Sequence, residues 1–202
     1  MAFSRIAFGT AAMSVSSVIR LVAQFFVVPI LSRILSPDDY GLMAMAMPFV
    51  LFMMTFTDAG VGQSLVRTAP QERSVWSTSF WLTIISGCGL ALVIICIAPL
   101  MATFFREPPL SPIIMALALV IIPQAGATIP EAALRRDNRY GFIAITEIAS
   151  VLTGIVLAVV IAMKGGGAWA LVAQQLGLYG VRFLLSFALS SFRPSLCFNL
   201  QG

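Results

Sequence analysis

The sequence predicts an all-α, polytopic integral membrane protein, built as a bundle of six transmembrane helices. Of its 202 residues, 59% are hydrophobic and only 10% are charged, whereas a soluble domain carries roughly a quarter of charged residues. The mean hydropathy is +0.99. Six apolar segments are each long enough to cross a bilayer, which takes about 20 mostly apolar residues. The composition therefore excludes a soluble globular fold.

Short connections join the six expected spans into one domain over residues 1–193, arranged as three helical hairpins. The spans are predicted over about 7–34, 37–66, 74–105, 112–135, 140–163 and 168–191. Residues 194–202 are expected to form a tail outside the membrane.

The first two spans have distinct sequence signals. The first is not expected to be a cleaved signal peptide, because its apolar stretch is too long and Arg20 interrupts it. The second has the clearest start of the six. Ser36 can cap the helix, Pro37 suits its first position, and Asp38 and Asp39 favour its positive end.

Prolines and a tryptophan mark the later spans. We expect Pro48 to kink the second span, and Pro123 and Pro130 to break the fourth. A Ser-Pro pair ending at Pro112 repeats the cap-then-proline start. The fifth span follows a polar, arginine-rich loop, and Trp169 anchors the start of the sixth at the membrane interface.

Aromatic residues and glycines indicate the ends and the packing of the helices. For the third span, the sequence places Trp76, Phe80 and Trp81 at one membrane interface and Phe104 and Phe105 at the other. Glycines inside spans favour close contact between helices, and they occur at positions 60, 62, 87, 89, 177 and 180.

The residue inventory excludes several kinds of chemistry. The chain has no histidine and three cysteines. Without histidine, His-based acid–base catalysis and the commonest metal ligand are absent, so we expect no catalytic residues, no enzyme activity and no metal site. Cys88, Cys96 and Cys197 are interpreted as small apolar residues. The net charge of +4 is interpreted as a sign of loop topology, and no nucleic-acid partner is expected.

The basic residues in the short connections predict the orientation. Seven lie on the side that holds both termini, and three lie on the other side. The seven are Arg5, Arg67, Arg73, Arg135, Arg136, Arg139 and Arg193, and the three are Arg33, Arg106 and Lys164. Both termini are therefore predicted to be cytoplasmic.

Polar side chains occur inside five of the six predicted spans, where they are costly unless a partner or a water-filled cavity receives them. At the rise of an α-helix, Asp58, Glu147 and Arg182 each fall roughly 10–15 Å from the cytoplasmic helix ends, and Arg20 falls about 20 Å in. Gln24 shares a helix face with Arg20. We therefore expect a hydrated cavity that opens to the cytoplasm.

Structural explanations stay open for these residues. An Arg20–Asp58 ion pair could be purely structural, or it could contact substrate, hold an ion or act as a gate. Glu131 and Arg135 lie near the interface, and they could be simple helix-end residues whose side chains reach the headgroups. Glu147 is equally open to a structural or a functional explanation.

Several runs of residues resemble one family of membrane proteins. They are Leu31-Ser-Arg-Ile-Leu-Ser-Pro-Asp-Asp-Tyr-Gly41, Asp58-Ala-Gly-Val-Gly-Gln-Ser-Leu-Val-Arg67, Ala133-Leu-Arg-Arg-Asp-Asn-Arg-Tyr140 and Gly167-Ala-Trp-Ala-Leu-Val-Ala-Gln-Gln175. In this order they are similar to the amino-terminal half of bacterial Wzx-like polysaccharide flippases, which belong to the multidrug/oligosaccharidyl-lipid/polysaccharide exporter superfamily. The Ser-Pro-x-Asp-Tyr-Gly turn is the most specific of these features.

This resemblance implies that the protein flips undecaprenyl-diphosphate-linked oligosaccharide across the bacterial inner membrane, for surface polysaccharide or lipopolysaccharide synthesis. It also implies roles for individual residues. Substrate binding in the cavity would involve Arg20, Gln24, Gln175 and Arg182, and charge balance or coupling to an ion of unknown identity would involve Asp58, Glu131 and Glu147. No cofactor is implied.

Family members have two helical lobes around a central cavity, and the six predicted spans correspond to one lobe. A second lobe or a homodimer partner is therefore expected, besides the lipid bilayer and the lipid-linked glycan. The alternatives are a cation-coupled exporter of small amphiphiles and a non-transporting membrane assembly subunit. A membrane enzyme of lipid metabolism is disfavoured, because neither histidine nor an Asp-rich pair at prenyltransferase spacing is present.

Overall fold

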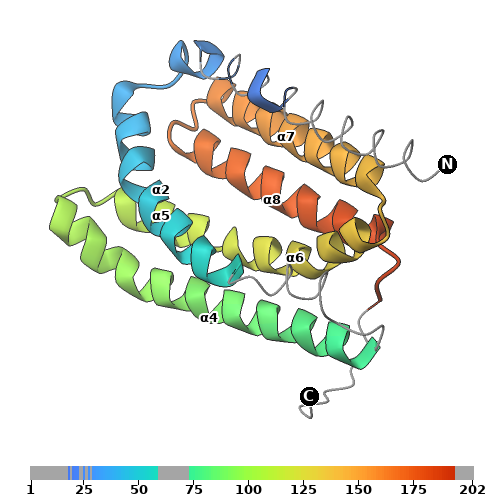
Figure 1. Cartoon of the computed structure of the whole chain (residues 1–202). Coiled ribbons are helices and arrows are strands. Elements are labelled where there is room, and N and C mark those ends of the chain that lie inside the picture. The colour runs from blue at the N-terminus through green and yellow to red at the C-terminus, as the bar shows by residue number, and fades with distance from the viewer. Residues whose placement is uncertain are drawn as a thin grey trace.

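The computed structural model describes residues 18, 20–22, 25, 27, 29–58 and 73–193 of the chain, and all regular secondary structure within them is helical (Figure 1). The helices are α2 (Pro37–Asp58), α4 (Arg73–Phe105), α5 (Leu110–Ala118), α6 (Ile121–Arg136), α7 (Tyr140–Met163) and α8 (Trp169–Leu189). The described positions between 18 and 32 are also helical. The all-α prediction is therefore confirmed.

Five stretches of the described chain are long and apolar enough to cross a membrane. They correspond to the second to sixth predicted spans. The first predicted span lies only partly within the described residues, as does the end of the second beyond position 58. The chain is a multi-pass membrane protein, and large apolar side chains such as Leu82, Leu92 and Phe104 on α4 point away from the bundle, with more than half of their surface exposed.

The fourth span is two helices, and its break falls just before Pro123, one of the two prolines predicted to break it. The helix is interrupted at Leu119 and Val120, whose N–H groups donate to Ala116 and Leu117 over shorter, three-residue turns. Pro123 has no N–H to donate to the carbonyl of Leu119, and a proline ring crowds the carbonyl four residues before it. The break therefore precedes Pro123.

The other two prolines predicted to kink or break a span lie within helices that continue past them. Pro130 lies inside α6, and Pro48 lies inside α2. The prediction that Pro130 breaks the fourth span is therefore wrong, while a kink at Pro48 stays a prediction.

The start of α2 is the capping device that its sequence predicts, and it also contacts α8. The Ser36 N–H and hydroxyl donate to Asp39 Oδ2 at 2.9 and 2.8 Å, and the Asp39 N–H donates back to the Ser36 hydroxyl at 3.2 Å. These bonds form a capping box. The other carboxylate oxygen, Asp39 Oδ1, accepts the N–H of Ala168 at 2.8 Å. One side chain thus fixes the beginnings of two helices.

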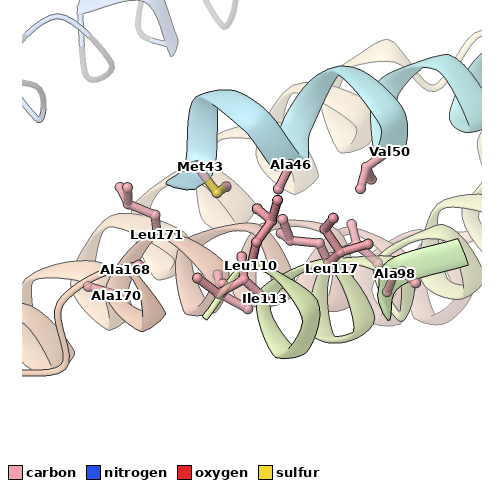
Figure 2. Packing of buried hydrophobic residues seen from close by; sticks show 14 of the residues in the cluster. Met43, Ala46, Val50, Ala98, Leu110, Ile113, Leu117, Ala168, Ala170 and Leu171 are labelled. Atoms are coloured by element: carbon pink, nitrogen blue, oxygen red, sulfur yellow. The ribbon is translucent and has the colours of Figure 1, made fainter. Parts of the chain in front are cut away.

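The main core lies where α2 crosses α5 and the start of α8. Figure 2 shows Met43, Ala46 and Val50 of α2 facing side chains of the other helices. Their counterparts include Leu110, Ile113 and Leu117 of α5, Ala98 of α4, and Ala168, Ala170 and Leu171 at the start of α8. Small residues at these crossings let the helices approach closely.

A second, aromatic cluster joins α4, α6 and α8 near the other end of the bundle. Trp76 and Phe80 are buried in it, at 7% and 4% exposure, and the Phe192 ring packs against both. Their position at one membrane interface stays a prediction, and their side chains point into the bundle. Phe104, at the far end of α4, is 76% exposed as expected.

Close helix contacts occur at some of the predicted glycines. A Cβ atom at Gly87 would lie 2.7 Å from that of Ala125 on α6, and Gly177 likewise meets Leu157 of α7. Gly89 and Gly180 have nothing within 4 Å of such a Cβ, so the prediction is wrong at these two. Positions 60 and 62 lie outside the described residues.

Candidate functional site: a charged cavity between helices

A cavity of about 310 Å³ lies between the first helical residues, α2, α7 and α8. Its polar wall consists of Arg20, Glu147, Ser150, Gln174, Gln175, Tyr179 and Arg182. The apolar remainder includes Met47 of α2 and Leu178 of α8. From Gln174 to Arg182 the wall extends about 12 Å along α8, at the usual helical rise. The cavity therefore reaches well into the span of α8.

The first ion pair of the cavity joins Arg20 to Glu147. Arg20 Nη1 lies 3.0 Å from Glu147 Oε1, and the two side chains are 49% and 25% exposed. Glu147 lies two turns into α7, so the pair connects α7 to the first helical segment. A pair this exposed contributes only about 0–1 kcal/mol to stability. Where water reaches the pair, it therefore holds Arg20 in place only weakly.

The second ion pair lies at the edge of the cavity and is more buried. Arg182 donates to both oxygens of Glu131, from Nε to Oε1 and from Nη2 to Oε2 at 2.9 Å. Glu131 is only 8% exposed, and Arg135 approaches it at 3.8 Å. The interpretation of Glu131 as a simple helix-end residue is therefore wrong. It is a buried acceptor that holds α6 against α8.

The two pairs are part of one network of charges. Glu147 also lies within electrostatic range of Arg182, so two arginines and two glutamates balance one another across the cavity wall. Such balance is what a charged group needs inside a membrane protein. The two arginines differ in how they are held. Arg182 donates to both oxygens of one carboxylate, whereas Arg20, whose side chain is 49% exposed, makes one ion pair among the described residues.

The structure brings together most of the site residues that the sequence predicts. Arg20, Glu147, Gln175 and Arg182 line the cavity, and Glu131 lies behind Arg182. Gln24 and the Asp58 side chain lie outside the described residues, so the Arg20–Asp58 pair stays a prediction. Among the described residues, Arg20 pairs with Glu147.

Sequence reasoning missed Tyr179 as a cavity residue. Tyr179 lies four residues after Gln175 and three before Arg182, so all three share one face of α8. The helical spacing was the signal that could have found it. Within the described residues, no group of three or more Cys, Asp or Glu side chains could hold a metal ion.

Comparison with known proteins identifies the family. A model of the polysaccharide biosynthesis protein family matches residues 30–202. The chain belongs to this family. No solved structure matches this family member.

Curated relatives of this polysaccharide biosynthesis protein come from several bacteria. It is 31% identical over 178 residues to the succinoglycan biosynthesis transport protein ExoT of Rhizobium meliloti strain 1021, covering 88% of this chain and 36% of the relative. It is 25% identical over 177 residues to the lipopolysaccharide biosynthesis protein WzxC of Escherichia coli K12, which covers 86% of this chain and 36% of the relative. An uncharacterized membrane protein in the cps region of Klebsiella pneumoniae is 27% identical over 148 residues, which covers 73% of this chain and 30% of the relative. The chain spans about a third of the length of these relatives. The resemblance to polysaccharide flippases is thus confirmed.

Proposed function

We propose that this chain is one lobe of a transporter that moves lipid-linked oligosaccharide from the cytoplasmic to the outer leaflet of the bacterial inner membrane. Family membership and the names of two relatives, a succinoglycan transport protein and a lipopolysaccharide biosynthesis protein, support a role in polysaccharide export. The proposed lobe is residues 1–193, and the proposed partner is a second lobe, either a separate chain or another copy of this one.

The observation that carries the proposal is the exchangeable arginine in the cavity. Arg20 faces the cavity and makes one 3.0 Å contact with Glu147. A diphosphate offers a guanidinium charge-assisted, bidentate hydrogen bonds. It would displace Glu147 from Arg20 at small cost, because the existing pair is half exposed. The displaced carboxylate would stay near Arg182, or would take up a coupling ion.

Amide and hydroxyl groups along the same wall suit the sugar portion of such a substrate. Gln174, Gln175 and Tyr179 lie on the face of α8 that lines the cavity. Amides can both donate to and accept from sugar hydroxyls, and an aromatic ring offers a flat apolar surface. We assign Arg182 chiefly to holding the wall in place, because Glu131 occupies two of its donors.

The orientation belongs to the same proposal. The last turn of α6 carries Arg135 and Arg136, the turn before α7 carries Arg139, and the segment after α8 carries Arg193. This favours the cytoplasm for this end of the bundle. A reporter domain inserted after Lys164, at the opposite end of α7, is expected to be active only outside the cytoplasm. A cytoplasmic signal at that position would contradict loading of the cavity from the cytoplasm.

The experiment replaces Arg20 in the host bacterium and measures surface polysaccharide. Arg20→Ala is expected to reduce export at least ten-fold at unchanged protein level, and Arg20→Lys is expected to retain part of it. Arg33→Ala is the matched control, because Arg33 is an exposed arginine outside the cavity. Equal export by Arg20→Ala and the control would refute the proposed role of the cavity.

A further inference from the structure

Four arginines gather at one end of the bundle, where α6 ends, α7 begins and α8 ends. They form an arginine patch of Arg135, Arg136, Arg139 and Arg193. They come from two segments of the chain, residues 135–139 and residue 193, and Trp76 of α4 contacts Arg136. The cavity residues described above do not include any of the four.

Three of these guanidinium groups are held in place by rings and carbonyl groups. Arg136 lies over the Trp76 ring at 5.3 Å, Arg139 over the Phe142 ring at 4.4 Å, and Arg193 over a ring of α8 at 5.6 Å. Arginine is suited to such stacking because its guanidinium is planar and weakly hydrated. Because these side chains are already ordered, less side-chain conformational entropy is lost when an anion binds.

Two of the arginines meet at the carboxyl end of α8. Arg139 Nη1 donates to the carbonyl of Leu189 at 3.3 Å, and Arg193 Nη1 donates to the carbonyl of Phe187 at 3.0 Å. Each guanidinium has five N–H donors, so donors remain after these bonds. The Ser191 hydroxyl donates to Asp137 at 2.9 Å, which fastens the α6–α7 turn to the same helix end.

The charge of the patch is strongly unbalanced. In the described segments 132–142 and 187–193 there are four arginines, and Asp137 is the one acidic residue. Arg135 makes a long 3.8 Å contact with Glu131, and its side chain remains 44% exposed. Among the described residues, the patch therefore presents a net positive surface, with guanidinium donors left over in a forked geometry.

The position of the patch selects its partner. Arg136 is the last residue of α6, Arg139 directly precedes α7, and Arg193 follows α8 by four residues. Each of these arginines lies at or near the end of a stretch that can cross a membrane, namely Leu110–Arg136, Tyr140–Met163 or Trp169–Leu189. Arginines at the ends of membrane spans lie at the depth of lipid headgroups. From this we propose that the arginine patch is a specific binding site for the phosphate of an anionic phospholipid headgroup, such as phosphatidylglycerol.

The test measures lipid retention by native mass spectrometry on the detergent-solubilised full chain. Titration with phosphatidylglycerol is expected to give a saturable bound lipid, and titration with phosphatidylcholine is not. The double substitution Arg136→Gln/Arg193→Gln is expected to weaken binding by roughly five-fold for each charge removed. Similar retention of both lipids by the unchanged protein would overturn the proposal.

Two controls separate a binding site from a general effect of charge or folding. Arg33→Gln/Lys164→Gln removes two charges at the opposite ends of the spans and is expected to leave retention unchanged. Asp137→Asn keeps an acceptor for Ser191 while removing the acidic charge, and it is expected to tighten binding. An equal loss in the opposite-end variant, or no gain in Asp137→Asn, would overturn the assignment.

Two competitors identify the source of the anion. Inorganic pyrophosphate is expected to displace the lipid only weakly, because it lacks the acyl chains that hold a headgroup at this depth. If pyrophosphate displaced the lipid at a concentration equal to that of phosphatidylglycerol, the patch would bind free phosphate and not lipid. Tighter binding of a polyglutamate peptide than of phosphatidylglycerol would overturn the lipid assignment in favour of an acidic protein partner.

Discussion

Removing the Glu131 carboxylate is the sharpest test of how the bundle tolerates its buried charge. Glu131→Ala leaves Arg182 without the two oxygens that it now contacts. Breaking a fully buried ion pair by removing one partner costs about 3–5 kcal/mol. The Arg182 side chain is 30% exposed and Glu147 lies within electrostatic range. We therefore expect a smaller loss of about 2 kcal/mol in the free energy of unfolding.

The loss can be measured as thermal unfolding of the purified chain in detergent. For a chain of this size, about 2 kcal/mol corresponds to a fall of roughly 4–8 °C in the melting temperature. Arg135→Ala is the matched control, because Arg135 contacts the same carboxylate at 3.8 Å while 44% exposed. Its removal is expected to cost less than about 1 kcal/mol.

A double variant decides whether the pair is the cause. Replacing both partners with apolar residues, Glu131→Leu/Arg182→Met, removes the uncompensated charge along with the pair, and such replacements are often neutral. The double variant is therefore expected to melt above Glu131→Ala. Additive losses from the two single substitutions would refute the reasoning, because independent residues add and coupled ones do not.

Three further predictions concern glycine and capping positions, all measured by the same melting assay. Gly167→Ala is expected to lower the free energy of unfolding by about 2 kcal/mol, because φ is +52° and the new Cβ would lie 2.7 Å from a carboxylate oxygen. Gly165→Ala also has a positive φ, but its Cβ meets open space, so it should lower the stability less. Equal losses in the two variants would show that the contact with the carboxylate does not matter. Gly154→Ala should lower the free energy of unfolding by about 1–3 kcal/mol, because its Cβ would lie 2.8 Å from a backbone carbonyl of α8. Gly89→Ala is the control and should be neutral, because its Cβ meets nothing within 4 Å. A neutral Gly154→Ala would contradict the close packing of α7 and α8. Ser36→Ala should lower the free energy of unfolding by about 1 kcal/mol, because it removes the helix cap. Ser36→Thr should keep most of that stability, and no loss in the alanine variant would show that the capping box contributes nothing.

Features that depend on neighbouring residues were predicted from the sequence with little error. The α7 helix begins and ends at Tyr140 and Met163, as expected, because the limits of an apolar run and the turns beside it are local properties. The capping by Ser36 and Asp39 follows from residues three apart. The break in the fourth span likewise arises from Pro123, whose effect falls on a carbonyl four residues earlier.

The charge pairing could not be derived in the same way. Arg182 and Glu131 are 51 residues apart in the sequence, so their contact depends on how α6 and α8 rotate and cross. The sequence indicates the depth of each charged residue, but several pairings satisfy the same depths. Arg20 could meet either Glu147 or Asp58 on this reasoning, and its 3.0 Å contact with Glu147 depends on how α7 packs beside the first helical residues.

The Asp39 carboxylate, which caps α2 while accepting a bond from the start of α8, has a mechanical consequence. Two helices fastened at one end can separate only by swinging apart about that end. Arg182 lies 14 residues beyond Ala168, about 21 Å along the helix axis. A swing of about 10° would therefore carry Arg182 by roughly 4 Å at this lever length. A cavity built on these helices would widen at its arginine end while its far end stays closed.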